Sequence, residues 1–466
     1  MSFIGRTQEL EMLEREYARP RPSLIVVLGR RRVGKSTLIL KSLQQKPFAY
    51  YQASRITDAD NIALLKQTLE ASFGADPILS SLSDWLGVFA YLELLATQRS
   101  GVTLVLDEFP YLCESNTGLP SLIQAAWDRI HAAQTPLNLI LCGSSIGFME
   151  ELLGERNPLR GRQSLTLDLE PMGFREVAAW VPKWKSDQQM MLAATLGGMP
   201  YYLSFIDPAS SLAANLREFV LERGAPLFNE PEHLLQAELQ TPQRYASILR
   251  AIADGCLEWG QIVGRVKDFK DGAQLAPYIK KLEGLRLVEI KKSLADSGKD
   301  RNRRYDLGDP FLRFWFHFVL PNRSALESGH AADVWSHLIE PHLNEFMGSA
   351  FERIAREYSA RHLQEAYGVP AREVGQVWAG DYDLDVAGTL LDGSSFYGEC
   401  KWWQEAVGEN ILERLLETSR RAGYGVQNAE TRFALFSRSG FTTALTKRAE
   451  NDSQLELFSP ARMLNR

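Results

Sequence analysis

The sequence has few of the features that mark disulfide-rich secreted proteins, proteins with structural zinc sites or membrane-spanning proteins. Only four cysteines occur in 466 residues, and none stands in a Cys-x-x-Cys spacing, which argues against a disulfide framework or a structural zinc site. No apolar run approaches the roughly 20 residues of a membrane span. The opening MSFIGRTQEL also lacks a basic region followed by a long apolar one. We therefore expect a cytoplasmic protein with no membrane partner.

A net positive charge is also missing. The formal charge is -6 and the pI is near 5.8, so the chain as a whole does not attract phosphate backbones. Any contact with nucleic acid must come from a local basic patch. The chain is 45% hydrophobic, which is typical of a globular protein, and its length predicts about three domains.

What the sequence does have is a complete nucleotide-binding motif. The segment SLIVVLGRRRVGKSTLIL holds an apolar run, then Gly-x-x-x-x-Gly-Lys-Ser, then a helical pattern, which is the strand, loop and helix context of a P-loop. Glycines let backbone N–H groups curl around phosphates, Lys35 reaches the β/γ oxygens, and Ser36 is placed for Mg²⁺. The predicted ATP-binding residues are Gly29, Arg30, Arg31, Arg32, Val33, Gly34, Lys35, Ser36 and Thr37.

Two further apolar strands end in residues that suit ATP hydrolysis. VTLVLDEFP ends in Asp107 and Glu108. Asp107 is predicted to hold the Mg²⁺ shell and Glu108 to polarise the attacking water, although both could simply cap the loop. LNLILCGSSIGFM ends in Ser144, whose hydroxyl is suited to orient that water or to sense the γ-phosphate. Hydrolysis as well as binding is therefore expected.

The loop PLRGR supplies two arginines, Arg160 and Arg162. One of them could act as an arginine finger toward the nucleotide of a neighbouring subunit, which would make the protein a homo-oligomer or the partner of another protein. Either arginine could equally be a solvated loop residue or act in its own subunit.

Four phrases, FIGRTQELEMLE, GRRRVGKST, LVLDEFPYL and LGGMPYYL, together resemble the archaeal-type, AAA+-related P-loop ATPases, which border the signal-transducing ATPases with numerous domains. The resemblance implies that the element from Phe3 to Leu10 brackets the nucleotide base. It also implies that Pro200, in a Gly-Gly-x-Pro turn, begins a helical lid against the adenine. Arg162 is the arginine that matches the family, because Arg160 stands where the family has tyrosine.

The pattern changes between about 241 and 309 to short helices followed by a hairpin, which predicts a winged helix-turn-helix. Residues 261 to 304 contain twelve Lys or Arg against six Asp or Glu. This local basicity favours contacts with DNA phosphates, for which the candidates are Lys280, Lys281, Arg301, Arg303 and Arg304. The alternative is that the module only covers or couples other domains. The aromatic segment that follows, DPFLRFWFHFVLP, indicates a buried packing helix rather than a base-stacking platform.

The last 125 residues begin with a helix that includes Glu352, followed by the strand DYDLDVAGTLL with Asp385 and the strand FYGECKWW. Glu399 and Lys401 stand two positions apart, so they project from the same face of their strand. The bland interpretation is a surface ion pair. In the order found here, however, Asp385 and Glu399 on neighbouring strands predict a Mg²⁺ or Mn²⁺ site with Glu352 as a further ligand. Lys401 would position the nucleophile or stabilise developing charge.

This order, with a further helix and strand after Lys401, is similar to the core of the PD-(D/E)xK nucleases. Arg420 and Arg421, on that helix, could approach DNA phosphates. The phrases NEFMGSAFERIAREY, DYDLDVAG, YGECKWW and LFSRSGF also resemble the domain of unknown function that follows these archaeal-type ATPases. Gln376 and Asp383 are weaker neighbours of the predicted metal site.

The expected fold is α/β, in four parts: a P-loop ATPase domain over 1–200, a helical lid or connector over 201–240, a winged helix with the packing helix over 241–320, and a restriction-endonuclease-like domain over 321–466. Two functions compete. The first is an ATP-binding and ATP-hydrolysing protein whose nucleotide state controls metal-dependent DNA cleavage. The second is a nucleotide-dependent switch that binds DNA or a protein without cleaving.

Overall fold

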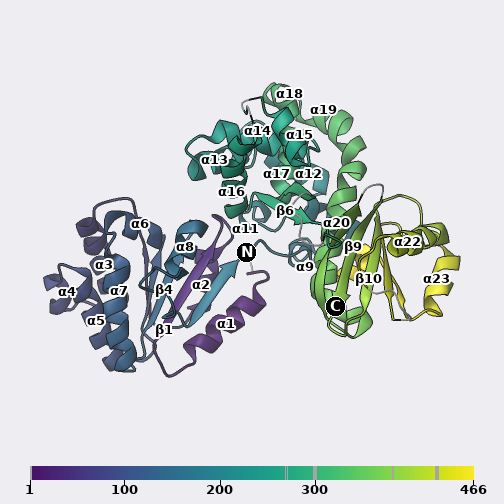
Figure 1. The fold of residues 1–466 in the computed structure, drawn as a ribbon. Coiled ribbons are helices and arrows are strands. Elements are labelled where there is room, and N and C mark those ends of the chain that lie inside the picture. The colour runs from purple at the N-terminus through teal and green to yellow at the C-terminus, as the bar shows by residue number, and fades with distance from the viewer. Residues whose placement is uncertain are drawn as a thin grey trace. The chain divides into compact units, whose positions relative to one another are not determined.

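Two compact units make up the computed structural model, which describes residues 3–267, 269, 271–296, 302–379, 382–425 and 430–465. The first unit comprises Met1–Pro171 and Met199–Tyr201, and the second comprises Met172–Gly198 and Tyr202–Arg466. The chain thus passes between the units three times rather than once. Figure 1 draws the first unit in purple to blue and most of the second in teal to yellow.

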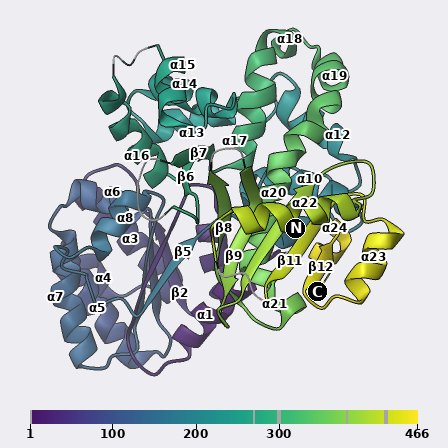
Figure 2. The same ribbon diagram turned by 45° about the vertical axis from the view of Figure 1, so that its right-hand side comes forward.

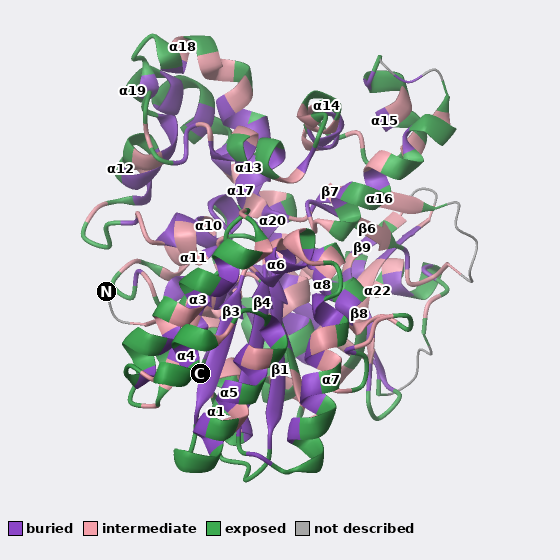
Figure 3. Ribbon diagram, turned by 90° about the vertical axis from the view of Figure 1, so that its left-hand side faces the viewer, coloured by how far each residue is buried: buried purple, intermediate pink, exposed green. Residues whose placement is uncertain are grey.

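A five-stranded parallel sheet forms the centre of the first unit, with the strand order β2-β3-β4-β1-β5. All residues of the three inner strands are buried, as the purple ribbons of β1, β3 and β4 show in Figure 3. A strand that is buried on both faces has a continuous run of apolar residues. The apolar runs in the sequence therefore predicted these strands. The strands are β1 (Ser23–Gly29), β2 (Phe48–Gln52), β3 (Thr103–Asp107), β4 (Asn138–Gly143) and β5 (Leu165–Leu169).

Helices cover both faces of this sheet. In Figure 1, α3, α4, α5 and α7 lie on one side of the strands and α1 lies on the other. The alternate residues Leu24, Val26 and Leu28 of β1 face the larger helical layer and join its apolar core. The helices are α1 (Thr7–Tyr17), α2 (Lys35–Ser42), α3 (Asp58–Phe73), α4 (Pro77–Ser81), α5 (Trp85–Gln98), α6 (Phe109–Ser115), α7 (Leu119–Ala132) and α8 (Ile146–Leu153).

The second unit begins with helices and a small hairpin. Its first helices are α9 (Phe174–Ala178), α10 (Ser186–Thr195), α11 (Pro200–Leu203, which starts in the first unit), α12 (Leu212–Leu216), the π-helix η1 (Arg217–Leu221) and α13 (Glu230–Glu238). The predicted order of short helices and hairpin follows in α14 (Pro242–Ala253), α15 (Trp259–Arg265), η2 (Gly272–Gln274), α16 (Ala276–Gly284), β6 (Val288–Lys292) and β7 (Arg303–Leu307). Strands β6 and β7 pair antiparallel.

A helical segment then leads to the C-terminal sheet. The aromatic side chains of Phe311, Phe314, Trp315 and Phe318 are buried there, as the packing interpretation predicts. Its elements are α17 (Pro310–Phe314), η3 (Trp315–Val319), η4 (Leu320–Asn322), α18 (Arg323–Glu327), α19 (Ala331–Val334), η5 (Trp335–Ile339), η6 (Glu340–His342), α20 (Leu343–His362) and α21 (Gln364–Tyr367).

The C-terminal sheet is mixed and has the order β12-β11-β10-β9-β8. The two pairings of β9, with β8 and with β10, are antiparallel, whereas the two pairings of β11 are parallel. Helices α20 and α22 both contact its central strands (Figure 2). Its elements are β8 (Ala371–Ala379), β9 (Tyr382–Leu390), β10 (Ser395–Lys401), α22 (Glu409–Arg421), β11 (Arg432–Ser437), α23 (Thr443–Glu450), β12 (Leu455–Phe458) and α24 (Pro460–Leu464).

The segment 172–198, expected within the ATPase domain, packs in the second unit instead. Arg175 fixes it there, because its guanidinium donates to both carboxylate oxygens of Glu365 at 2.7 and 2.8 Å and to the Met463 carbonyl at 2.7 Å. Arg438 and Asp187 form a further ion pair at 3.3 Å. The boundaries at 200, 240 and 320 stay predictions.

Candidate functional site

The P-loop joins the end of β1 to the start of α2 in a backbone conformation that requires glycine. Gly29 has a φ of 147°, and a Cβ there would lie 2.5 Å from the Leu169 carbonyl oxygen. Gly34 has a φ of 91°, also in the region that favours glycine. Lys35 is buried, and its ammonium donates to the carbonyls of Gly29 at 2.8 Å and Arg30 at 3.1 Å. The loop therefore holds its lysine beside the position that phosphates take in such loops.

Asp107 lies at the end of β3 beside the start of α2. Its Oδ2 accepts hydrogen bonds from Ser36 Oγ at 2.7 Å and from the Tyr50 hydroxyl. Burial by itself would raise the pKa of Asp107, but donors that include the Cys142 thiol, Tyr50 and Ser36 together hold that pKa below its usual value. The structure thus brings Ser36 and Asp107 together, and their role in a magnesium shell stays a prediction.

Glu108 is held by Ser144 from the neighbouring strand end. Ser144 Oγ donates to Glu108 Oε2 at 2.9 Å, and the Ser144 amide lies 3.4 Å from the same oxygen. Glu108 has a φ of 51°, a left-handed conformation that is uncommon for a residue with a side chain. Strain of this kind is maintained by its surroundings and clusters at active sites. The structure therefore couples the two residues predicted to handle the attacking water.

The two segments that the resemblance expects around the nucleotide base both contact the P-loop, one from each end of the first unit. Buried Arg6 donates to the Val33 carbonyl at 3.2 Å and to the Glu170 carbonyl at 2.6 Å. Pro200 lies against Gly34, since a Cβ at Gly34 would meet Pro200 Cγ at 3.5 Å. Arg32 lies over the Tyr201 ring at 4.1 Å.

The two loop arginines pair with acids of their own unit. Arg162 makes a two-pronged contact with Asp128 of α7, at 2.7 and 2.8 Å, and also donates to the Pro158 carbonyl. Arg160 lies 3.4 Å from Glu155. To act on a neighbouring nucleotide, Arg162 would have to exchange Asp128 for a phosphate.

A second group of charged side chains gathers in the C-terminal sheet. Gly398 of β10 pairs with Val386 of β9, which brings the next residues on each strand, Glu399 and Asp385, side by side. The Cys400 amide donates to Asp385 Oδ2 at 2.9 Å, and Lys401 Nζ donates to Glu399 Oε1 at 2.5 Å. Asp385, Glu399 and Lys401 are therefore neighbours, and we call them, with Glu352, the acidic cluster.

The electrostatics of the acidic cluster show that its carboxyl groups repel one another. Burial raises the pKa of Asp385 well above its usual value, and the charges of Glu352 and Glu399 add to that increase. Burial also raises the pKa of Glu352, with Arg356 opposing the change. Burial alone would lower the pKa of Lys401, but Glu399 raises it. Gln376 donates to Glu352 at 3.4 Å, which brings one of the weaker predicted neighbours to the cluster.

The carboxylate oxygens of Glu352, Asp385 and Glu399 are of the kind that divalent cations take as ligands, and a metal site here stays a prediction. A nearby positive ion would oppose the effect of Glu352 and Glu399 on the pKa of Asp385, and carboxylate oxygens are the ligands Mg²⁺ prefers. Within the part of the chain that the structure describes, no three acidic, cysteine or histidine side chains are grouped closely enough to hold an ion by themselves. A cation here would therefore retain several waters, as Mg²⁺ commonly does.

The chain matches two families of known proteins. Residues 3–206 match the family described as an ATPase domain predominantly from Archaea. Residues 315–413 match archaeal and bacterial proteins of unknown function, and this range holds all four residues of the acidic cluster. An uncharacterized protein of Methanocaldococcus jannaschii is 30% identical over 86% of this chain and 87% of its own length. The chain belongs to the archaeal-type ATPase family.

Other relatives agree with the ATPase assignment. An uncharacterized ATP-binding protein of M. jannaschii is 50% identical over 44 residues, which are 9% of this chain and 75% of that protein. The solved Walker-type ATPase of Pyrococcus abyssi has a TM-score of 0.51 and 20% identity, and the match covers 67% of this chain and 96% of that one. This archaeal-type ATPase therefore has an α/β fold with a parallel-sheet P-loop core, followed by a C-terminal domain with a mixed sheet.

Some residues that lie at the two sites were not predicted from the sequence. Tyr50 lies on the edge strand β2, and only the order of the strands brings it to Asp107. Cys142, at the end of β4, is likewise beside Asp107. In the C-terminal domain of the archaeal-type ATPase, Arg356 follows Glu352 by one helical turn and donates to the Asp385 carbonyl at 2.7 Å. That i, i+4 spacing was the one signal available in the sequence.

The described residues that were predicted to contact DNA phosphates lie on three different elements, α16, β7 and α22. Lys280 and Lys281 are exposed on α16, and Arg303 and Arg304 lie on β7, whereas Arg301 lies outside the described residues. Arg420 and Arg421 are exposed at the end of α22. Among the helices described for this archaeal-type ATPase, none is both long and apolar enough to cross a bilayer.

Proposed function

We propose that this ATPase uses its nucleotide state to control a metal-dependent DNA-cleaving site in its C-terminal domain. The observation that carries the proposal is the meeting of Asp385, Glu399 and Lys401 at the β9–β10 pair. Two carboxylates beside a lysine are the groups that metal-dependent hydrolysis of a phosphodiester uses. The restriction-endonuclease-like fold expected for residues 321–466 is part of this proposal.

Each residue of the acidic cluster has its own role in the proposal. Asp385 and Glu399 supply hard oxygen ligands for Mg²⁺ or Mn²⁺, and Glu352 ligates directly or through water. The metal, when bound, lowers the pKa of a water molecule to give the nucleophile. The Lys401 ammonium holds Glu399 in place and stabilises the negative charge that develops on the phosphate.

The helices α14 to α16 and the β6–β7 hairpin support a DNA-binding role, because their order is that of a winged helix. Exposed Lys280 and Lys281 on α16, and Arg303 and Arg304 on β7, would contact phosphates. Arg420 and Arg421, exposed at the end of α22, would add further phosphate contacts.

Control would begin at the P-loop. Lys35 and the backbone of Gly29 to Thr37 bind the ATP phosphates, Ser36 and Asp107 hold the Mg²⁺ shell, and Glu108 positions the water with Ser144. If the protein assembles, Arg162 would leave Asp128 to contact a neighbouring nucleotide. Each nucleotide state would then favour a different affinity or access for DNA in the second unit.

The decisive experiment incubates the purified protein with plasmid and single-stranded DNA, with Mg²⁺ or Mn²⁺, and with or without ATP. Wild type is compared with Lys401→Ala, Lys35→Ala and the matched control Lys447→Ala, which removes an exposed lysine of α23 in the same domain. We expect nicking that Lys401→Ala abolishes and Lys447→Ala leaves intact. Altered nicking in Lys35→Ala, with the Lys401 site unchanged, would demonstrate control by ATP.

A switch that binds DNA or a protein without cleaving is the second candidate. The pairing of Lys401 with Glu399 favours it, because the lysine already neutralises one of the two metal-binding carboxylates. The lack of a three-ligand group among the described residues points the same way. Wild type that hydrolyses ATP and binds DNA but never cleaves, with either metal, would favour the switch over the nuclease.

A further inference from the structure

A pocket of about 410 Å³ lies beside the acidic cluster, between the β6–β7 hairpin and the C-terminal sheet. Its volume is within the range of small-ligand sites. Residues of β6, of α20 and of the edge strand β8 form its walls, together with Leu294, which follows β6. Val374 and Trp378 belong to β8. The Leu294 amide donates to the Gln376 carbonyl at 2.9 Å, and the Trp378 amide donates to Ser293 Oγ at 3.0 Å. The segment that follows β6 is therefore hydrogen-bonded to β8 and forms one side of the pocket.

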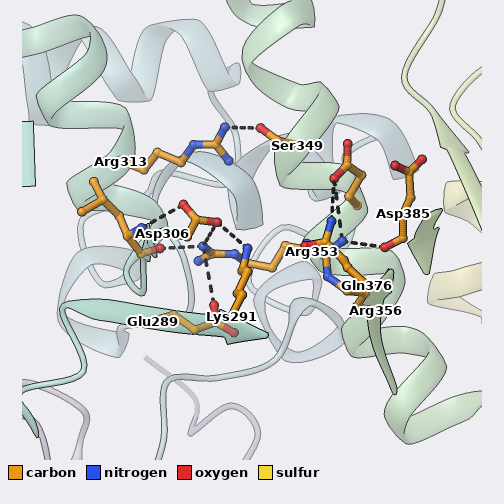
Figure 4. A network of polar contacts seen from close by, with 11 residues as sticks. Glu289, Lys291, Asp306, Arg313, Ser349, Arg353, Arg356, Gln376 and Asp385 are labelled. Atoms are coloured by element: carbon orange, nitrogen blue, oxygen red, sulfur yellow. Dashed lines mark hydrogen bonds and ion pairs between the residues drawn. The ribbon is translucent and has the colours of Figure 1, made fainter. Parts of the chain in front are cut away.

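The charges that line the pocket are mainly positive. Lys291, Lys292, Arg353 and Arg356 line it against the two acids Glu289 and Glu357. Figure 4 shows Lys291 and Arg353 converging on a single carboxylate, Asp306. Lys291 Nζ lies 2.6 Å and Arg353 Nη2 lies 3.0 Å from the same Asp306 oxygen. Asp306 thus serves two of the four cations that line the pocket. Glu289 lies farther from Arg353, at 3.9 Å, and Glu352 lies 3.7 Å from Arg356.

The pKa of Lys291 reflects both its burial and the charges around it. Burial lowers the pKa of Lys291, and although Asp306 opposes this effect, Arg353 and Arg356 lower the pKa further. Burial is the largest cause of this lowered pKa, and the two arginines act in the same direction, so an additional anion beside Lys291 would oppose both effects.

The pocket also borders the acidic cluster. Arg356 lines the pocket and contacts the cluster, lying 3.7 Å from Glu352 and donating to the Asp385 carbonyl. Gln376 likewise lines the pocket while it donates to Glu352. An anion in the pocket would therefore lie next to the carboxylates without lying among them.

We propose that this pocket binds a nucleotide phosphate of the strand that the acidic cluster acts on. Arg356 and Lys292 contact the phosphate, Gln376 bonds to it or to the sugar, and the Trp378 side supplies an apolar wall. The site rests on the proposed function for its substrate, although its binding chemistry is independent of cleavage. A free nucleotide has the same chemistry, so the experiment includes both sources.

The test measures binding in EDTA, where metal-dependent cleavage cannot occur. The probes are a fluorescent single-stranded oligonucleotide, the duplex of the same sequence, and deoxyadenosine 5′-monophosphate as competitor. The full-length variants are Lys292→Ala, Lys292→Glu and the control Lys447→Ala. Lys292 and Lys447 are both exposed lysines of the second unit, so their removal should not unfold the protein. Circular dichroism checks the fold of each variant.

We expect Lys292→Ala to weaken oligonucleotide binding about three- to tenfold, Lys292→Glu to weaken it more, and the salt dependence to lose about one phosphate contact. Lys447→Ala should bind as wild type does. Competition by the monophosphate that Lys292→Ala abolishes would assign the pocket to free nucleotide as well as to the strand. Equal affinities of Lys292→Glu and Lys447→Ala for every probe would overturn the proposal. A loss of binding in Lys292→Glu, in a protein that never cleaves, would keep the pocket and refute only the nuclease.

Discussion

Asp107 illustrates how much one side chain depends on donors that are distant in the sequence. Tyr50, 57 residues earlier, and Ser36, 71 residues earlier, donate to the same oxygen. Against the opposing effect of burial, these donors keep the pKa of Asp107 below its usual value. Such a group stabilises the fold above its unfolded pKa, which is about 4 for aspartate, and that stability is lost as pH falls through the folded pKa.

Tyr50→Phe should therefore destabilise the protein in a pH-dependent way. We expect the free energy of unfolding to fall by about 2 kcal/mol at pH 7, because a charged acceptor loses a donor. The difference should narrow as pH falls below about 4, the unfolded pKa, toward the lower pKa of Asp107 in the folded protein. Urea denaturation at both pH values measures it. Tyr51→Phe is the matched control on the same strand, since its hydroxyl donates to neutral Asn61 at 2.6 Å. Equal pH dependence of the two variants would contradict the explanation.

At the scale of elements, a backbone hydrogen bond joins the first residue of the segment 172–198 to the last. The Met172 amide donates to the Gly198 carbonyl at 2.8 Å. A Cβ on Gly198 would lie only 1.8 Å from the Met172 carbonyl oxygen. The backbone at Met172 and the backbone at residue 198 can therefore approach this closely only because residue 198 is glycine.

Gly198→Ala should consequently lower the free energy of unfolding by about 2 kcal/mol or more, because backbone rather than a flexible side chain must move. Gly348→Ala provides the control, since a Cβ at this position in α20 meets nothing within 4 Å. Alanine favours helix, so Gly348→Ala should be neutral or stabilise by up to about 1 kcal/mol. Chemical denaturation followed by circular dichroism compares the two, and a neutral Gly198→Ala would show that the turn can relax.

Asp306 joins two elements of the second unit, the β6–β7 hairpin and α20. It accepts from Lys291 of the hairpin and Arg353 of the helix, and Arg353 also donates to the Leu307 carbonyl at 2.5 Å. Burial would raise the pKa of Asp306, but Arg353 and Lys291 hold it far below the usual range. Its stabilising effect is thus complete at neutral pH and is lost only as the solution becomes strongly acidic.

Asp306→Ala should cost about 3–5 kcal/mol at pH 7, because it leaves two largely buried cations, with side chains 15% and 23% exposed, without their shared carboxylate. The loss should shrink as pH falls below about 4 toward the folded pKa. Glu289→Ala is the control on the same hairpin: Glu289 is 53% exposed and lies 3.9 Å from Arg353, so its removal should cost less than about 1 kcal/mol. Urea titrations across pH distinguish the two, and similar costs for both variants would contradict the role of Asp306.

At the scale of the whole molecule, control by ATP requires that nucleotide and DNA alter each other's affinity. A non-hydrolysable ATP analogue should change the affinity for duplex DNA about 5- to 150-fold, and by linkage DNA should change the affinity for the analogue by the same factor. Paired titrations in EDTA-free buffer with Lys401→Ala protein avoid cleavage. Lys35→Ala should abolish the effect, whereas Lys41→Ala, an exposed lysine on the same helix, should keep it. If the affinity for the ATP analogue is the same with and without saturating DNA, such control is excluded.

The sequence by itself determined the parts of this protein that depend on neighbours along the chain. The P-loop, the buried parallel strands, the aromatic packing segment and the helix–strand order around Glu399 all follow from local patterns of apolar residues and glycines. Their spacing also indicated that Glu399 and Lys401 share one face, because side chains alternate along a strand.

Only the tertiary structure decided which of these parts meet. The strand order puts Tyr50 on Asp107, the β9–β10 register brings Asp385 beside Glu399, and the segment 172–198 leaves the ATPase unit for the second unit. The basic pocket depends on residues of β6, α20 and β8 that are far apart in the chain. Pairing between strands and helices is set by the burial and hydrogen bonding of the whole fold, which no local periodicity specifies.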